Sequence, residues 1–410
     1  MKIWIKVIVS AVIGALFGII LPFDSVQVQE FFSFLVELFS GMGRYVLYPL
    51  IFFSLAYGTF ELKQEKRILA VYGKAFLYAV ILSLGCILLA IGTVLLFSPG
   101  RIPVMVEEES AIQVYGLKDI LLAMFPKNLF TVFSGTGDVL IPLCFFAFFL
   151  GLNFTFDRLV TRPVTQFFDS MTRIFYHINT FITEVIGFTM IAFAAFAIGR
   201  LQGAAELALF RELLLLLTLD TIIVVFGVYP AILYFYLGMK NPYKWLFAII
   251  APAITGLVSG DNFMSLSLLI RHGKENLGIP RKIGASTFPF FAIFGKAGTA
   301  MVSSLTFLMI LRSYSSLGIG FFTFFWVLFA GLIVSVAASS APAMGAFVAV
   351  SLMCSMYGRG IEEGFLILKP VIPLIISVGA CIDVLNNAFA SFVIAHKEKM
   401  LKEVDIKDYI

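Results

Sequence analysis

Two residues of opposite charge, Lys296 and Asp383, each lie deep inside an apolar stretch of the C-terminal half. Lys296 is about 13 residues inside its predicted helix, roughly 20 Å from that end. A lysine near a helix end reaches the membrane interface with its long side chain, which does not suit this depth. A carboxylate at the depth of Asp383 is costly unless it is paired, so it indicates a binding role or a partner for broken backbone. The chemistry expected of such residues is electrostatic binding of an ionic solute or a proton.

Polar residues interrupt two further apolar stretches. Asp261 and Asn262 divide the stretch that ends at Arg271, and Ser339, Ser340 and Pro342 lie near the middle of the charge-free run 313–358. Turn formation alone explains such residues, because their side chains hydrogen-bond the local backbone. Proximity to a substrate is the alternative, and both interpretations stay open here.

The remaining ionisable residues are easier to explain structurally. Glu184 fits a structural or interface role, and Asp220 faces an unknown neighbour, for which Lys74 is a candidate. No phosphate-binding loop, nucleophile elbow or metalloprotease motif is present, so the sequence favours neither an enzyme nor a bound cofactor or metal. The histidines read as interfacial and the cysteines as small buried hydrophobes: His177, His272, His396, Cys86, Cys144, Cys354 and Cys381.

The composition is that of a polytopic membrane protein. Of 410 residues, 60% are hydrophobic and only 13% are charged, and the mean hydropathy is +1.00. Soluble domains are closer to 45–50% apolar and about 25% charged. The bases form no stripe, so nucleic-acid binding is not expected. The apolar segment 2–23 has a basic start but no obvious cleavage site, which favours a first membrane span over a signal peptide.

Six apolar runs of ordinary length precede residue 240, and they predict six membrane-spanning helices. The pattern then changes, because 245–260 is too short for two spans, and 313–358 as one helix would be about 69 Å long. Each of these two stretches is better explained as a helical hairpin that enters the membrane and returns to the same side. A broken span follows each hairpin: 283–311 is interrupted at Gly295–Thr299, and 361–396 at 379–383 and 386–387.

A hairpin followed by a broken helix, occurring twice, predicts inverted repeats with a binding site at the membrane midplane. The fold class expected is therefore an all-α membrane protein with eight transmembrane helices and two re-entrant hairpins. Basic residues concentrate on the predicted cytoplasmic side only if both hairpins are re-entrant. We expect an integral protein of the plasma (inner) membrane with cytoplasmic N- and C-termini.

Short motifs in the right order resemble the dicarboxylate/amino acid:cation symporter family, which includes the glutamate transporters, over nearly the whole chain. Thr287-Phe288-Pro289 followed by Gly298-Thr299-Ala300 is similar to the family's Thr-Leu-Pro and Asp-Gly-Thr-Ala. The other matches are Pro49-Leu50-Ile51-Phe52, Ile141-Pro142, Phe149-Leu150-Gly151, Gly187-Phe188, Gly278-Ile279-Pro280, Pro342 with Gly345, and Val393-Ile394-Ala395.

The resemblance implies an elevator-type homotrimer surrounded by membrane lipid. Residues 1–68 (spans 1 and 2) and 101–200 (spans 4 and 5) would form a scaffold. Residues 69–100 (span 3) and 201–410 (span 6, first hairpin, span 7, second hairpin, span 8) would form a mobile transport domain.

The family's functional residues carry over poorly. The Arg that binds a substrate's side-chain carboxylate falls at Gly379, the Asp that holds an amino group at Ile376, and the Asn substrate ligand at Asp383. Two sodium-binding Asp residues fall at Ala297 and Asn387, and an Asn near them falls at Gly295. We therefore expect the Lys296 ammonium to take the electrostatic role of a bound sodium ion, with Asp383 as counter-ion.

The expected function is secondary transport of a small organic solute, a carboxylate or an amino acid, with proton-coupled or uncoupled transport in place of sodium coupling. The alternative is an uncoupled channel or a sensor on the same fold. The candidate substrate-binding residues are Asp261, Asn262, Ser339, Ser340, Pro342, Lys296, Thr299, Asp383 and Asn387, and the candidate coupling residues are Lys296 and Asp383.

Overall fold

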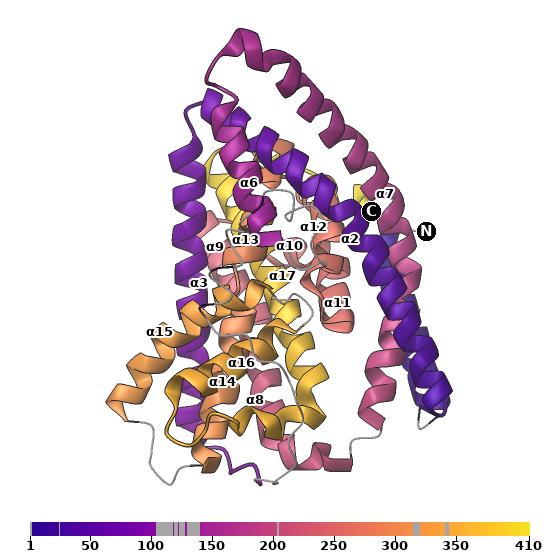
Figure 1. Cartoon of the computed structure of the whole chain (residues 1–410), viewed down its shortest axis with the longest axis vertical. Coiled ribbons are helices and arrows are strands. Elements are labelled where there is room, and N and C mark those ends of the chain that lie inside the picture. Colours follow the sequence, from indigo (N-terminus) through magenta and orange to yellow (C-terminus); the bar gives the residue numbers. More distant parts are fainter. Residues whose placement is uncertain are drawn as a thin grey trace.

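The computed structural model describes residues 2–23, 25–103, 140–202, 205–314, 320–340 and 344–410, with the single residues Lys118, Leu122 and Asn128. All regular elements in these ranges are helices (Figure 1). Seven helical stretches among them are long and apolar enough to cross a membrane. Of the eight predicted spans, the fourth is described only over the shorter apolar helix Leu140–Asn153. Glu107, Glu108 and Glu109, an acidic segment between the third and fourth predicted spans, lie outside the described residues.

The N-terminal half consists of long helices that pack on one another. Helices α1 and α2 both pack along α7, and α6 packs on α2; α2 and α7 form the inclined outer edge of the molecule in Figure 1. Glu184 of α7 pairs with Lys6 of α1 and accepts a hydrogen bond from Arg271 Nη1 at 3.0 Å, which is a structural role. The bounds of these elements are α1 Ile3–Ile20, α2 Val26–Gln64, α3 Ile68–Phe97, α6 Leu140–Asn153 and α7 Arg158–Gln202.

The sixth span contains a change of helical type. A short 3₁₀ turn, η1 (Ala205–Phe210), leads into α8 (Arg211–Ile222), and a π-helical segment, η2 (Ile223–Val228), joins α8 to α9 (Tyr229–Leu237). The span ends at Gly238, whose φ of 69° is left-handed. Leu207–Leu237 is long and apolar enough to cross a membrane, as expected for the sixth apolar run before residue 240.

Both predicted hairpins are present as pairs of short helices that pack on each other. The first is formed by α10 (Tyr243–Ala248) with α11 (Ile250–Ser259), and then α12 (Asn262–Glu275). Its turn begins at Gly260, which has a φ of 64°, a region that glycine occupies readily. The second is formed by α15 (Phe321–Ala337) and α16 (Gly345–Tyr357), with a short 3₁₀ turn, Ala338–Ser340, after α15.

The seventh span is broken where the sequence predicts, between α13 (Arg281–Phe294) and α14 (Ala297–Tyr314). The predicted interruptions of the last span at 379–383 and 386–387 are wrong. Helix α17 runs without a break from Ile372 to Lys397, and the irregular segment precedes it as the 3₁₀ turn η4, Gly364–Val371. The irregularity falls there because Pro370 and Pro373 have no N–H to donate to a continuous α-helix.

The core of the C-terminal half is centred on α14, whose residues from Ala297 to Leu311 are all buried. Helices α3, α16 and α17 pack against it. The side chains exposed on the outer helices are largely apolar, for example Leu16, Phe31 and Leu96. Such a surface suits contact with lipid rather than water.

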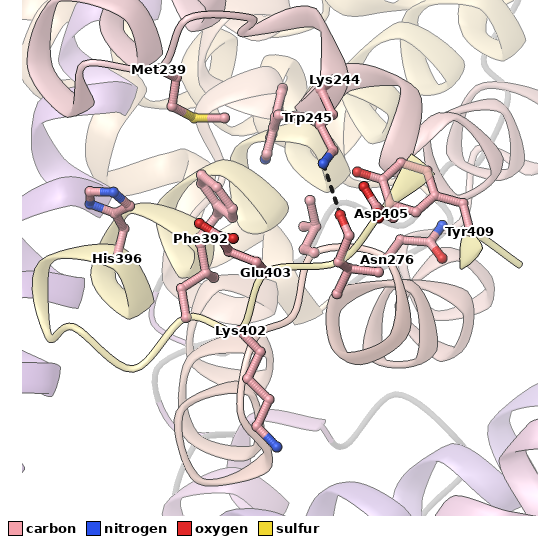
Figure 2. A pocket seen from close by; sticks show the side chains of 13 residues that line it. Met239, Lys244, Trp245, Asn276, Phe392, His396, Lys402, Glu403, Asp405 and Tyr409 are labelled. Atoms are coloured by element: carbon pink, nitrogen blue, oxygen red, sulfur yellow. Dashed lines mark hydrogen bonds between the residues drawn. The ribbon is translucent and has the colours of Figure 1, made fainter. Parts of the chain in front are cut away.

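The segment after α17 folds back over the end of the bundle and ties several elements together. Lys244 Nζ donates to the Val404 carbonyl at 2.8 Å, and Ile410 N donates to Asn276 Oδ1 at 3.0 Å. Lys2 Nζ donates to the Lys407 carbonyl at 2.9 Å, which places both described ends together (Figure 1). Figure 2 shows the cavity of about 610 Å³ that this segment borders, with Lys244 and Asp405 on its wall.

Candidate functional site

The break in the seventh span frees backbone carbonyls that side chains from other elements satisfy. Asn386 Nδ2 donates to the Gly295 carbonyl at 2.9 Å, and Asn387 Nδ2 donates to the Phe288 carbonyl at 3.0 Å. Ser339 Oγ donates to the Ile293 carbonyl at 2.6 Å. Irregular backbone at membrane depth requires such partners. One predicted site residue, Ser339, thus helps to hold the break in shape. Asn387, another, binds a carbonyl inside α13 and ties that helix to α17.

Asp383 of α17 lies at the N-terminus of α14 and accepts hydrogen bonds from groups in the first turn of that helix. Its Oδ1 accepts from the backbone N–H groups of Gly298 at 2.8 Å and Thr299 at 3.0 Å, and its Oδ2 accepts from Thr299 Oγ1 at 2.7 Å. A carboxylate is favoured at this end of a helix because the unpaired N–H groups and the helix dipole are both positive there. Asp383 is therefore a buried cap supplied by a neighbouring helix.

Gly298 is the residue that allows this close approach. A Cβ atom at position 298 would lie 2.4 Å from the Gly379 carbonyl oxygen and 2.8 Å from Asp383 N. Only glycine permits the backbones of α14 and α17 to meet at this distance. The Gly-Thr pair that resembles the family motif is thus needed for the geometry around Asp383.

Lys296 lies in the break itself, and its side chain is 4% exposed. Its Nζ is 3.6 Å from Asp383 Oδ2, so the structure brings the two residues together as the sequence analysis expects. Asn262, from the tip of the first hairpin, directs its Nδ2 to the same oxygen at 3.4 Å. Two regions distant in sequence, the tip of the first hairpin and the break in the seventh span, therefore surround one carboxylate of α17.

Asp261 caps the first hairpin's second helix and also contacts the N-terminal half. Its Oδ1 accepts from Phe263 N at 2.7 Å, and its Oδ2 accepts from Arg44 Nη2 of α2 at 3.1 Å. Arg44 was not among the predicted residues. Its signal in the sequence is weak, because it reads only as a charge at the edge of an apolar run.

The second hairpin covers the same region. The side chain of Ser340 and all of Pro342 lie outside the described residues, but the start of α16 is defined. A Cβ atom at Gly345 would lie 3.7 Å from Thr299 Oγ1, and one at Gly379 would lie 3.1 Å from the Ala346 Cβ. The position at which the family places its substrate-binding Arg is therefore filled by the second hairpin.

The arrangement has a surplus of hydrogen-bond donors. The oxygens of Asp383 already accept from Gly298, Thr299 and Asn262, whereas the ammonium of Lys296 has three N–H groups to donate. Within the described ranges, Lys296 Nζ forms its ion pair with Asp383 Oδ2 at 3.6 Å, which is longer than a hydrogen bond. Within the same ranges, no three His, Cys, Asp or Glu side chains are grouped to hold a metal ion. The site is therefore suited to a further acceptor, such as a carboxylate.

Hairpins, a broken helix and a buried charged pair define a membrane protein of the secondary-transporter type. The sodium:dicarboxylate symporter family matches residues 3–397, and the chain belongs to this family. The resemblance expected from the motifs is confirmed.

Two relatives illustrate the range of this similarity. A proton/sodium-glutamate symport protein of Bacillus caldotenax is 21% identical over 429 residues, covering 100% of this chain and 96% of the relative. A C4-dicarboxylate transport protein of Cupriavidus pinatubonensis is 26% identical over 208 residues, covering 48% of this chain and 47% of the relative.

Proposed function

We propose that the protein is a secondary transporter that carries a small organic carboxylate or amino acid across the plasma membrane. Membership of the sodium:dicarboxylate symporter family supports this class of activity. The relatives named for transport of glutamate and C4-dicarboxylates support an anionic substrate. The main support for the proposal is the pair Lys296 and Asp383. The Asp383 carboxylate already accepts hydrogen bonds from other groups, so the N–H groups of the Lys296 ammonium can donate to a bound solute.

Transport follows an elevator mechanism in this proposal. The scaffold is formed by 1–68 and 101–200, and the transport domain by 69–100 and 201–410. The packing of α1 and α2 with α7 and of α6 with α2, and the packing of α3, α16 and α17 with α14, supports this division. By resemblance to the family, the scaffold helices assemble a homotrimer with cytoplasmic termini.

Lys296 replaces a bound sodium ion in this mechanism. A monovalent cation in a low-dielectric site needs an opposite charge close by, and the positions that carry sodium-binding Asp residues in the family are Ala297 and Asn387 here. Asp383 serves instead as the counter-ion of a covalently attached ammonium. Transport is then independent of sodium and either proton-coupled or uncoupled.

The test is uptake of carboxylates and amino acids into liposomes that contain the purified protein, with external sodium replaced by choline. We expect unchanged uptake by the wild type and loss of most uptake in Lys296→Met. Lys240→Met is the matched control, because Lys240 is exposed and lies in the loop before the first hairpin. A steep dependence of wild-type uptake on sodium would contradict the proposal, as would full activity of Lys296→Met. Accumulation against a gradient distinguishes a coupled transporter from a channel.

A further inference from the structure

A second buried carboxyl group, Asp220 of α8, lies outside the site described above. Its side chain is fully buried, at 0% exposure, and its Oδ1 has no hydrogen-bond partner. Its Oδ2 is 3.1 Å from Thr93 Oγ1 of α3. Lys74, the candidate partner from the sequence, pairs with Glu398 instead, so that pairing is wrong. No ion pair to Asp220 occurs among the described residues.

The Thr93 hydroxyl group can serve Asp220 in either protonation state. Thr93 Oγ1 is also 3.1 Å from the carbonyl oxygen of Ala90, one turn earlier in α3. When Asp220 is protonated, its O–H donates to Thr93 Oγ1, and the hydroxyl donates in turn to Ala90. When Asp220 is ionised, the hydroxyl rotates and donates to the carboxylate. The two states differ by one proton and one hydroxyl rotation, without movement of the backbone.

The surroundings favour the protonated state at rest. An ionised carboxylate with one hydrogen bond and no cation is costly in a dry interior. Cys86 of α3 lies within electrostatic range of both Asp220 and Asp383. The elements that contact α8 carry Tyr72, Lys74, Tyr78 and Cys86 (α3), Cys381, Asp383, His396 and Lys397 (α17), Arg312 and Tyr314 (α14) and Glu206 (η1); η2 carries none. Cys86 is the member of this set with an electrostatic contact to Asp220 in the described ranges.

The helix that carries Asp220 is irregular immediately after it. The π-helical segment begins at Ile223, whose N–H donates to the carbonyls of both Asp220 and Leu219. Segments of this type are rare and occur frequently at functional sites, where they allow a local change in the helix.

We infer that Asp220 is the proton-binding site of the transport cycle. The carboxylate takes up one proton on one side of the membrane to become a neutral carboxylic acid, and returns the same proton to water on the other side. No other bond forms or breaks. This inference rests on the proposed function, because it names the ion that accompanies the solute.

The test uses the full-length protein in liposomes that contain a pH-sensitive dye. In the wild type, solute uptake is expected to acidify the lumen, and a gradient of one pH unit to support about tenfold accumulation, since one pH unit equals a factor of ten in proton concentration. Asp220→Asn is expected to keep exchange of labelled for unlabelled solute but to lose both proton entry and accumulation. Glu212→Gln is the matched control, because Glu212 is an acid on the same helix whose carboxylate bonds to Gly100 N at the surface.

A readout that does not depend on transport accompanies these assays. The infrared difference spectrum between wild type and Asp220→Asn should contain the carbonyl stretch of a protonated carboxylic acid, and Thr93→Val should shift it. Absence of that band overturns the inference, and so does accumulation driven by a pH gradient in Asp220→Asn. Solute exchange by a wild type that moves no protons also overturns it, and leaves the proposed function standing. Failure of the wild type to exchange any carboxylate or amino acid, with the band present, counts against the proposed function alone.

Discussion

At the scale of single residues, the site depends on how many donors surround each charged oxygen. Asp383 accepts two backbone N–H groups and the Thr299 hydroxyl, so its negative charge is stabilised without a metal ion. Lys296 contributes the compensating positive charge at 3.6 Å. A buried pair of this kind stabilises a protein only when the remaining donors and acceptors are satisfied. The hydroxyl of Thr299 is therefore as important to the pair as the charges themselves.

Replacement of Thr299 by valine tests this dependence. The substitution keeps the shape of the side chain and removes the 2.7 Å hydrogen bond to Asp383. Hydrogen bonds to charged groups contribute about 1.5–3 kcal/mol, so we expect Thr299→Val to lower the free energy of unfolding by that amount and to weaken solute binding.

Thr306→Val is the control for this experiment, because Thr306 lies on the same helix and its buried hydroxyl has no hydrogen-bond partner. Thermal unfolding of the purified variants measures both effects. Equal stabilities for Thr299→Val and Thr306→Val would show that the hydroxyl of Thr299 does not support the carboxylate.

At the scale of helices, much of the arrangement was predictable. The length of the charge-free runs predicted both hairpins, and the Gly295-Lys296 sequence predicted the break in the seventh span. The last span was predicted less well, because Asn386 and Asn387 were interpreted as polar residues that interrupt the helix in which they lie. They instead donate to carbonyls of the seventh span, which leaves α17 continuous. Sequence alone does not say whether an amide bonds to its own backbone or to a neighbouring helix.

The close contact between α14 and α17 leads to a second prediction. Gly298→Ala places a Cβ atom 2.4 Å from the Gly379 carbonyl oxygen, so the two helices must separate. Overpacking of this kind costs about 1–3 kcal/mol, and it also moves the α14 N–H groups away from Asp383. We expect lower thermal stability together with loss of solute exchange.

A glycine in an open position provides the comparison. A Cβ atom at Gly92 of α3 has no neighbour within 4 Å, so Gly92→Ala should be neutral or stabilising by about 0.5–1 kcal/mol, because alanine favours the helix. If Gly298→Ala is as stable and as active as Gly92→Ala, the close contact between α14 and α17 is required neither for stability nor for solute exchange.

At the scale of the whole molecule, the two hairpins place consecutive loops on defined sides of the membrane. Between Lys240 and Glu363 the chain forms a hairpin, one full span and a second hairpin, so the two residues should lie on opposite sides. Both are exposed. The four native cysteines are free and buried, so a cysteine introduced at either position should react with little background.

We therefore expect Lys240→Cys to react with a membrane-impermeant maleimide from the cytoplasmic side only, and Glu363→Cys from the outer side only. Labelling of intact cells and of inverted vesicles measures the two accessibilities. Reaction of both residues from one side would mean that one of the predicted hairpins is instead a single membrane-spanning segment.

The covalent attachment of the Lys296 ammonium also has a thermodynamic consequence. A sodium ion that enters with the solute is released inside and brings the energy of its gradient, whereas a tethered ammonium returns with the transport domain and does no net work over a cycle. In the proposed mechanism, the proton at Asp220 therefore drives uphill movement of the solute. One proton carried with one monovalent anion transfers no net charge, so the membrane potential, which acts on each elementary charge with about 2.3 kcal/mol per 100 mV, has no effect on the balance. The steady-state concentration ratio of such a solute is then set by the difference in pH alone, at about 1.4 kcal/mol per pH unit.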